Sequence, residues 1–145
     1  MKRTLIVVLI IVVILGVLLF FVKKDDRSKV CFDDDCFVVE VVDTPTERET
    51  GLMYREEMDK KNGMLFIFET PGNYPFWMKN TLIPLDIIWI DLDGKVVDIK
   101  TALPCKTDPC EIIDHEGSAK YVLEINSGLA EKYDISIGAN ADISI

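Results

Sequence analysis

The chain has 145 residues, a length that fits one folded domain. Hydrophobic residues make up 49% of it, and the eighteen consecutive residues from Leu5 to Val22 carry no polar or charged side chain. Only Lys2 and Arg3 are charged before this run, so the rest of the chain has 14 basic residues against 25 acidic ones, a formal charge of about −11. Such a surface repels phosphate groups, which argues against nucleic-acid binding.

The apolar run 5–22 has the length of a membrane-spanning helix, because about 20 residues cross the hydrocarbon core of a bilayer. It predicts an uncleaved signal-anchor, with residues 1–4 as a short cytoplasmic N-terminus and residues 23–35 as a polar linker. The alternative is a cleaved secretory signal that begins with Met1–Arg3. However, the run is longer than the apolar part of such a signal, and no small-x-small cleavage pattern follows it.

Four cysteines form two pairs of equal spacing, Cys31 with Cys36 and Cys105 with Cys110. An even number at matched spacing indicates disulfides in an oxidising compartment, although four cysteines allow three connectivities. We favour closure within each pair, because each pair brackets a turn-rich loop. The alternative is a zinc site of four thiolates, which the spacing also allows. Basic residues flank both ends of the apolar run, so the disulfides decide the orientation and place the globular part outside the cytoplasm.

Short strands and two short helices follow in chain order. Residues 36–42 are β-branched and predict a strand. Thr44, Pro45 and Glu47 form a capping box with proline at the first helical position, so they predict a short helix that ends near Gly51. Further strands are predicted at 63–68, 76–78, 85–92, 95–101 and 120–125, with strand-like segments between 135 and 145.

Turn residues connect these elements and decide the fold class. Asp93-Gly94 predicts a two-residue type I′ hairpin, and Ser127 is predicted to cap a helix that runs to Lys132. The order of elements lacks βαβ alternation. The sequence therefore predicts an α+β, mostly-β domain over residues 36–145, a compact antiparallel sheet or partly open barrel with two short helices, preceded by one transmembrane helix.

An unusual patch of eleven residues starts at the strand 76–78. It places an aromatic wall beside a cation, an amide, a hydroxyl and a carboxylate, which is the mixture that a small-ligand site needs. The candidate ligand-binding residues are Trp77, Lys79, Asn80, Thr81 and Asp86. Trp77 offers a stacking face, and Lys79 with Asn80 suits a carboxylate or a sugar hydroxyl. The alternative is that the aromatic residues belong to the core and the polar ones form a turn.

Two arginines and one glutamate complete the candidate site. Arg48 and Arg55 lie on the first predicted helix and its exit, where they suit a carboxylate or a phosphate. The alternative is that they pair with the neighbouring glutamates. Glu124, in the strand 120–125, is a lesser candidate.

The sequence contains no complete set of nucleophile, base and orienting group, which argues against an enzyme and implies no cofactor. His115 is the single histidine, and a disulfide would consume the thiol of Cys110. A further alternative is Cu(I) binding by the thioethers of Met53, Met64 and Met78, since a soft ion prefers soft ligands. Methionine that fills gaps in a core is the competing interpretation.

Three strings carry a family resemblance. They are Arg48-x-x-Gly51-Leu52-Met53-x-Arg55, Gly63-Met64-Leu65-Phe66-Ile67-Phe68, and Phe76-Trp77-Met78-Lys79-Asn80-Thr81-x-Ile83-Pro84-Leu85-Asp86-Ile87-Ile88. With Tyr121-Val122-Leu123-Glu124 and Gly128, they resemble the DUF192 family, also called UPF0127, over about residues 36–145. The resemblance implies a small β-rich domain, often secreted or anchored, without an established activity. The loop from Pro104 to Cys110 resembles archaeal members in particular.

Together these observations predict a single-pass protein of the cell membrane whose globular part binds a small polar ligand outside the cytoplasm. The bilayer is its expected partner through residues 5–22. The competing hypothesis is an interaction or scaffold module, in which the loop 76–86 contacts a partner protein.

Overall fold

The computed structural model describes residues 27–106 and 108–145. The predicted N-terminus 1–4 and the predicted transmembrane helix 5–22 lie outside these residues. Within the described ranges, no helix is long and apolar enough to cross a membrane. The described elements are β1 (Lys29–Phe32), β2 (Asp35–Val42), α2 (Pro45–Thr50), β3 (Asn62–Gly72), β4 (Phe76–Trp77), β5 (Leu85–Ile90), β6 (Val96–Ala102), β7 (Ile112–Ile113), β8 (Ala119–Asn126), α3 (Leu129–Lys132) and β9 (Asp142–Ser144).

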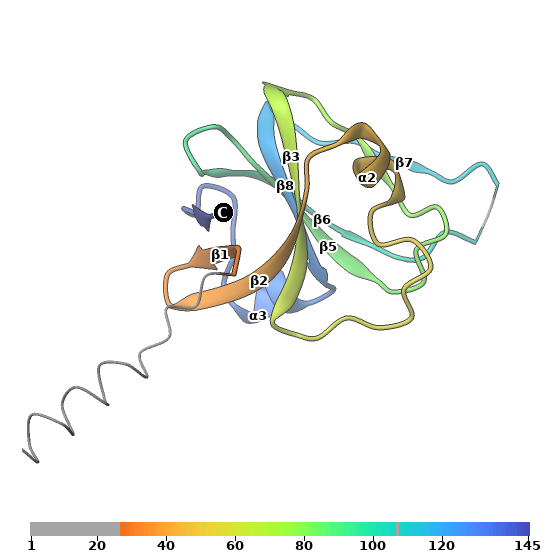
Figure 1. Cartoon of the computed structure of the whole chain (residues 1–145), viewed down its shortest axis with the longest axis horizontal. Coiled ribbons are helices and arrows are strands. Elements are labelled where there is room, and N and C mark those ends of the chain that lie inside the picture. The colour runs from red at the N-terminus through yellow and green to blue at the C-terminus, as the bar shows by residue number, and fades with distance from the viewer. Residues whose placement is uncertain (1–26, 107) are drawn as a thin grey trace, which may run out of the picture.

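Seven strands form one curled sheet in the order β6-β5-β8-β3-β2-β1-β9, and β4 pairs with β7 in a small second sheet. Figure 1 shows the large sheet curling into a half-barrel, with β3 and β8 at its centre. At one end of the sheet the start of β6 contacts the segment just before β9. There the Val96 N–H donates to the Ala139 carbonyl at 2.9 Å, and Lys95 and Asn140 form an isolated antiparallel β-bridge. The predicted mostly-β fold with two short helices is therefore confirmed in the form of a partly open barrel.

One strand pair departs from the predicted antiparallel sheet. β2 and β3 run parallel, with Val39 opposite Gly63 and Val42 opposite Phe66. Parallel neighbours need a crossover connection, and α2 with the loop after it provides that connection. The predicted antiparallel arrangement therefore does not extend to this pair, because β2, α2 and β3 form a βαβ unit.

The predicted capping box of α2 is confirmed. The Glu47 N–H donates to Thr44 Oγ1 at 3.3 Å, and the Thr44 N–H donates to Glu47 Oε2 at 3.2 Å. Pro45 occupies the first turn, and Gly51, at φ 45°, ends the helix. These interactions lie within eight residues, so local sequence suffices to encode them.

The predicted cap of the second helix is wrong. Gly128, with φ 80°, precedes α3 and makes no side-chain capping bond, so Ser127 is not the N-cap. Instead, the carboxylate of Asp86 on β5 accepts the Ala130 N–H at 2.9 Å. A side chain from a distant strand thus replaces the local cap that the sequence suggests.

The hairpin between β5 and β6 also differs in detail from its prediction. The Gly94 N–H donates to the Asp91 carbonyl, and the Asp91 N–H donates to the Lys95 carbonyl. Gly94 has φ 82°, whereas Asp93 has no positive φ, so the turn is a three-residue loop rather than type I′. The Asp91 carboxylate accepts the backbone N–H groups of Asp93 and Lys95 and takes part in holding this loop.

The first strand lies inside the predicted linker 23–35. Residues 29–32 form β1, which pairs with β2 so that Cys31 faces Cys36. Val30 and Phe32 are buried, whereas the turn residue Asp33 has φ 49°. Only four residues carry the strand pattern, and they follow a charged stretch, which explains why the sequence suggested a linker.

Side chains from the two faces of the curled sheet enter two separate cores. One core contains Ile88 and Ile125 together with residues of α3, and the other contains Ile87, Trp89 and Val122. The central strands β3, β5 and β8 alternate between the two cores, so they are buried on both faces. Three carboxyl-bearing residues of the described chain are buried: Asp86 on the α3 side, Glu124 on the opposite side, and Asp98 on β6.

Candidate functional site

A groove lies beside α2, on the face of the sheet opposite α3. It consists of an inner hollow of about 30 Å³ and an outer hollow of about 260 Å³. Five residues line both hollows, namely Arg48, Glu49, Phe66, Phe76 and Trp77. We call the two hollows together the α2 groove. The inner hollow has room for a single small functional group, and the outer one for a small organic body.

Glu124 lines the inner hollow and is its most unusual residue. Its neighbours in the sheet are Met64 on β3 and Ile87 on β5, and its side chain is 4% exposed. No donor among the described residues hydrogen-bonds the carboxyl group, and burial raises its pKa from 4.5 to about 8. A buried carboxyl group of this kind stays protonated at neutral pH, so it offers an O–H donor to the hollow.

Arg48 forms the α2 side of the groove. Its Nη1 donates to the backbone carbonyls of Asp43 and, at 2.8 Å, of Ile67. Its guanidinium also lies over the ring of Phe68, 5.1 Å from the centroid. These contacts hold the guanidinium in one orientation. Within the described residues, Nη2 and Nε of Arg48 make no hydrogen bond, so they remain as donors for a ligand.

The loop after β4 forms the opposite side. Trp77 is 38% exposed, and the Lys79 ammonium group lies 5.0 Å from the centroid of its ring. No acidic group of the described chain lies within ion-pair distance of Lys79. The hydroxyl group of Thr81, which donates weakly to the Lys79 carbonyl at 3.4 Å, belongs to a buried residue of the same lining. The groove thus combines two cations with an aromatic wall.

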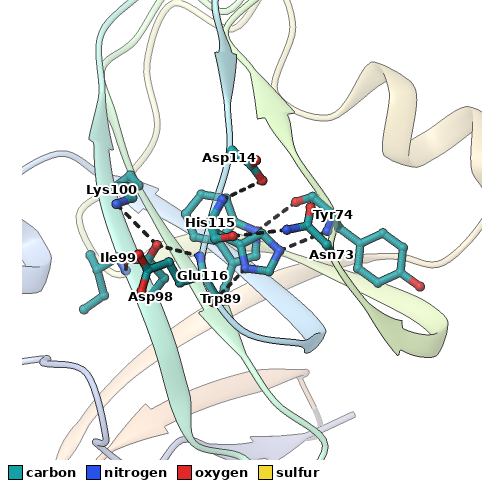
Figure 2. A network of polar contacts seen from close by, with 9 residues as sticks. All are labelled: Asn73, Tyr74, Trp89, Asp98, Ile99, Lys100, Asp114, His115 and Glu116. Carbon is teal, nitrogen blue, oxygen red and sulfur yellow. Dashed lines mark hydrogen bonds and ion pairs between the residues drawn. The ribbon is translucent and has the colours of Figure 1, made fainter.

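The aromatic wall is positioned by a polar network, which Figure 2 shows from close by. The His115 ring accepts the Tyr74 N–H at Nε2 (2.9 Å), and its Nδ1 lies 3.1 Å from the Glu116 carbonyl. Trp89 stacks on the same ring, with centroids 4.9 Å apart, and its indole N–H donates to the Tyr74 carbonyl. Both backbone groups of Tyr74 are therefore fixed, and this residue lines the outer hollow.

Acidic side chains complete this network. The Asp114 carboxylate accepts the His115 N–H at 2.9 Å, and the Asp98 carboxylate accepts the Glu116 N–H at 3.1 Å. Lys100 pairs with Asp98 at 3.3 Å. His115 is 6% exposed and both ring nitrogens have partners, so its geometry is that of a structural residue.

Replacing His115 by alanine is expected to lower the free energy of unfolding by about 2 kcal/mol, because the Tyr74 N–H loses its acceptor and Trp89 loses its stacking partner. Urea denaturation followed by tryptophan fluorescence measures this loss. Asp114→Ala removes a single hydrogen bond to His115 and serves as the control. It should lower the free energy of unfolding by less than His115→Ala does. Equal stability of His115→Ala and the wild-type protein would contradict the structural role.

Five of the predicted site residues line the α2 groove, namely Arg48, Trp77, Lys79, Thr81 and Glu124. The other three do not. Arg55 forms a two-pronged ion pair with Glu40 on β2, at 2.5 and 2.6 Å, so its partner is a glutamate fifteen residues away and not one of the neighbouring glutamates that the alternative named. Asn80 donates to the Tyr54 hydroxyl group at 2.8 Å. Asp86 is 1% exposed and binds Thr101 and the α3 backbone, so it stabilises the fold.

The cysteines form the disulfides Cys31–Cys36 and Cys105–Cys110, which confirms closure within each pair. The bonds consume all four thiols, so the zinc alternative is wrong.

The three methionines of the Cu(I) hypothesis lie in different surroundings. Met64 and Met78 are 2% and 3% exposed and pack in the core on the groove side. Met53 is half-buried, and its sulfur lies 3.8 Å from the Asn80 amide nitrogen. The burial of Met64 and Met78 favours the packing interpretation.

Several residues of the groove were not predicted. They are Glu49, Phe66, Phe68, Tyr74 and Phe76. One signal was available, because Met64, Phe66 and Phe68 alternate along β3 and therefore share one face. No local signal connects that face to Tyr74, because the contact depends on the distant His115.

The fold and groove together define a class, a small half-barrel domain with a partly apolar groove beside its crossover helix. The profile of the DUF192 family, described as "Uncharacterized ACR", matches residues 28–143. The chain therefore belongs to the DUF192 family.

Two similar proteins are the UPF0127 proteins of Thermococcus gammatolerans and Thermococcus sibiricus. They are 32% identical over 100 residues and 29% identical over 104 residues, respectively. These alignments cover 69% and 72% of this chain. They span less than two thirds of the two relatives, 62% and 64% of their lengths.

Two solved structures are also similar, both with a TM-score of 0.72 and 35% identity. One is a protein of Sinorhizobium meliloti described as a "putative transcription regulator", where the match covers 81% of this chain and 92% of the other. The second is a protein of unknown function from Novosphingobium aromaticivorans, where it covers 80% and 83%.

Proposed function

We propose that this protein is a membrane-anchored domain that binds a small ligand in the α2 groove outside the cytoplasm. The observation that carries the proposal is Glu124, a 4% exposed residue whose carboxyl group faces the inner hollow and receives no hydrogen bond from the described residues. Leaving such a group unpaired costs free energy, so folded proteins rarely keep one without a use. Two cations and an exposed tryptophan beside it supply the orientation and contact area that a ligand needs.

The anchoring part of the proposal depends on sequence and on cysteine chemistry. The apolar run 5–22 has the length and composition of a spanning helix. The two disulfides are typical of an oxidising compartment, which supports a location outside the cytoplasm. The acidic charge of the globular part opposes DNA binding, so the description of the Sinorhizobium relative is not carried over to this chain.

Ligand binding is tested with the full-length protein in detergent micelles and a library of monosaccharides, amino acids, carboxylates and amines. Trp77 is exposed whereas Trp89 is fully buried, so a groove ligand should change the fluorescence of Trp77 and raise the melting temperature. We expect at least one compound class to change the tryptophan fluorescence and to raise the melting temperature. The fluorescence change should be absent in Trp77→Phe.

Two arginine variants provide a matched control. Arg48→Ala removes a cation of the groove and should weaken binding about tenfold or more. Arg55→Ala removes an exposed ion pair outside the groove and should leave binding unchanged. Equal ligand binding by Arg48→Ala and Arg55→Ala would contradict this proposal. The scaffold hypothesis would be favoured if no compound stabilised the protein and a partner protein bound it stably.

A further inference from the structure

The charges that line the α2 groove distinguish between ligand classes. Arg48 and Lys79 are positive, Glu49 is negative, and Glu124 is the other acidic residue of the lining. With the buried Glu124 protonated, the lining has a net positive charge on a protein whose formal charge is −9. A local excess of positive charge on an acidic surface favours an anionic group.

The hydrogen-bond donors that line the groove also favour an anionic ligand. Arg48 is held by Asp43 and Ile67 through Nη1, which leaves Nη2 and Nε available as donors. The ammonium group of Lys79 has no acidic partner in the described part of the chain. The protonated Glu124 adds an O–H donor, and a bond from a carboxylic acid to a carboxylate is among the strong hydrogen bonds of proteins.

The outer hollow determines the rest of the ligand. Phe68 and Tyr74 stack with centroids 3.6 Å apart, and Phe66 meets Phe76 edge to face at 4.9 Å. These rings and Trp77 form walls with little polar surface, so they suit a flat apolar body. Because the two hollows share five residues, one molecule can place its body in the outer hollow and its charged group in the inner one.

We infer that the α2 groove binds a carboxylic acid with a flat apolar body, and that the Glu124 carboxyl group donates a hydrogen bond to the ligand carboxylate. This inference rests on the proposed function and names its ligand class. The opposite arrangement, an ammonium group on an ionised Glu124, brings a third cation beside Arg48 and Lys79. It also requires the buried Glu124 to lose the proton that burial favours, so the two effects together disfavour it.

Three probes with the same ring and different charge test the inference on the full-length protein. Benzoate, benzyl alcohol and benzylamine are titrated against the intrinsic fluorescence of Trp77 at pH 6.5. We expect benzoate to bind at least about tenfold more tightly than the other two, because only benzoate pairs with both cations. Tighter binding of benzylamine, equal binding of benzoate and benzyl alcohol, or no binding of benzoate would each overturn the inference.

Variants separate the roles of the groove residues. Glu124→Gln keeps a donor at the same place, so benzoate affinity should stay within about threefold of wild type, whereas an ammonium site would lose its anion. Lys79→Ala, at an exposed position that takes part in no core packing, should weaken benzoate about fivefold. Loss of benzoate binding in Glu124→Gln, or an unchanged affinity in both Lys79→Ala and Arg48→Ala, would refute the assignment.

The pH dependence tests the Glu124 donor directly. Between pH 6.5 and 9.5 the wild-type protein should lose benzoate affinity by about tenfold or more, because the ionised carboxylate of Glu124 repels the ligand. The charged groups that face Glu124 across the hollow are Arg48, Glu49 and Lys79, and Glu124→Gln retains them all. The same loss in Glu124→Gln would therefore overturn the donor role. The library screen, which does not depend on this ligand class, tests the proposed function separately.

Discussion

Raising the pH from 5 to 8 is expected to lower the unfolding free energy of this protein by roughly 3–5 kcal/mol through Glu124 alone. The pKa of Glu124 is about 8 in the folded state, against 4.5 for an exposed glutamate. Between these values the unfolded chain releases the proton while the folded chain keeps it. Stability from this group is therefore fully present below pH 4.5 and is lost as the pH rises through 8.

The comparison with Glu124→Gln isolates this effect from the other titrating groups. Urea denaturation of both proteins at pH 5, 6, 7 and 8 gives two curves of stability against pH, and their difference should grow in favour of the variant as the pH rises. Glu47, whose pKa is lowered by its bonds to Thr44, contributes equally to both curves. Parallel curves would mean that Glu124 is ionised in the folded protein, which would also remove the basis for its role as a donor.

Replacing Asp86 by alanine is expected to destabilise the fold by about 3 kcal/mol. The carboxylate accepts the Ala130 N–H at 2.9 Å and the Thr101 hydroxyl group at 2.7 Å, in a place that water does not reach. Its removal leaves the first turn of α3 without a cap, and it takes the acceptor away from the buried Ala130 N–H and from the Thr101 hydroxyl group. Equilibrium urea unfolding with the disulfides intact measures the loss.

Two further variants identify the cause of this loss. Thr101→Val removes one of the two donors and should cost about 1 kcal/mol, since the carboxylate keeps the bond from Ala130. Asp86→Asn retains an acceptor oxygen, so its loss of unfolding free energy should lie between those of Thr101→Val and Asp86→Ala. If Asp86→Ala were as stable as the wild-type protein, the carboxylate would have no structural role, and its prediction as a ligand-binding residue would regain support.

Local sequence predicted the features whose determinants lie close together in the chain. The capping box of α2 needs only Thr44 and Glu47, and each disulfide joins cysteines five residues apart. β-branched and apolar runs bounded by turn residues predicted β2, β3, β5 and β6, and the alternation of residues 120–125 predicted β8, all within a few residues of their bounds. In these cases the interaction that decides the structure is readable without knowledge of the fold.

The buried carboxyl groups of Asp86 and Glu124 show why the site itself was harder to predict. Asp86 and Glu124 both lie in apolar strands. Because side chains alternate along a strand, the sequence shows which neighbours share a face with each carboxyl group, but it does not show which element covers that face. The cover of Asp86 is α3, whereas the cover of Glu124 is a groove beside α2. α2 lies beside this groove because it connects the parallel strands β2 and β3. The parallel pairing was not predicted, because local sequence does not show beside which strand the chain re-enters the sheet after a helix.

The position of β1 has a consequence for access to the groove. The chain enters the described domain at the edge formed by β1 and β9, whereas α2 and β7 lie on the other side of the half-barrel (Figure 1). The point at which the chain enters the described domain is therefore on the side away from α2. Immobilisation at that point, on a bead or a sensor chip, should leave the groove open to solutes arriving from the bulk solvent.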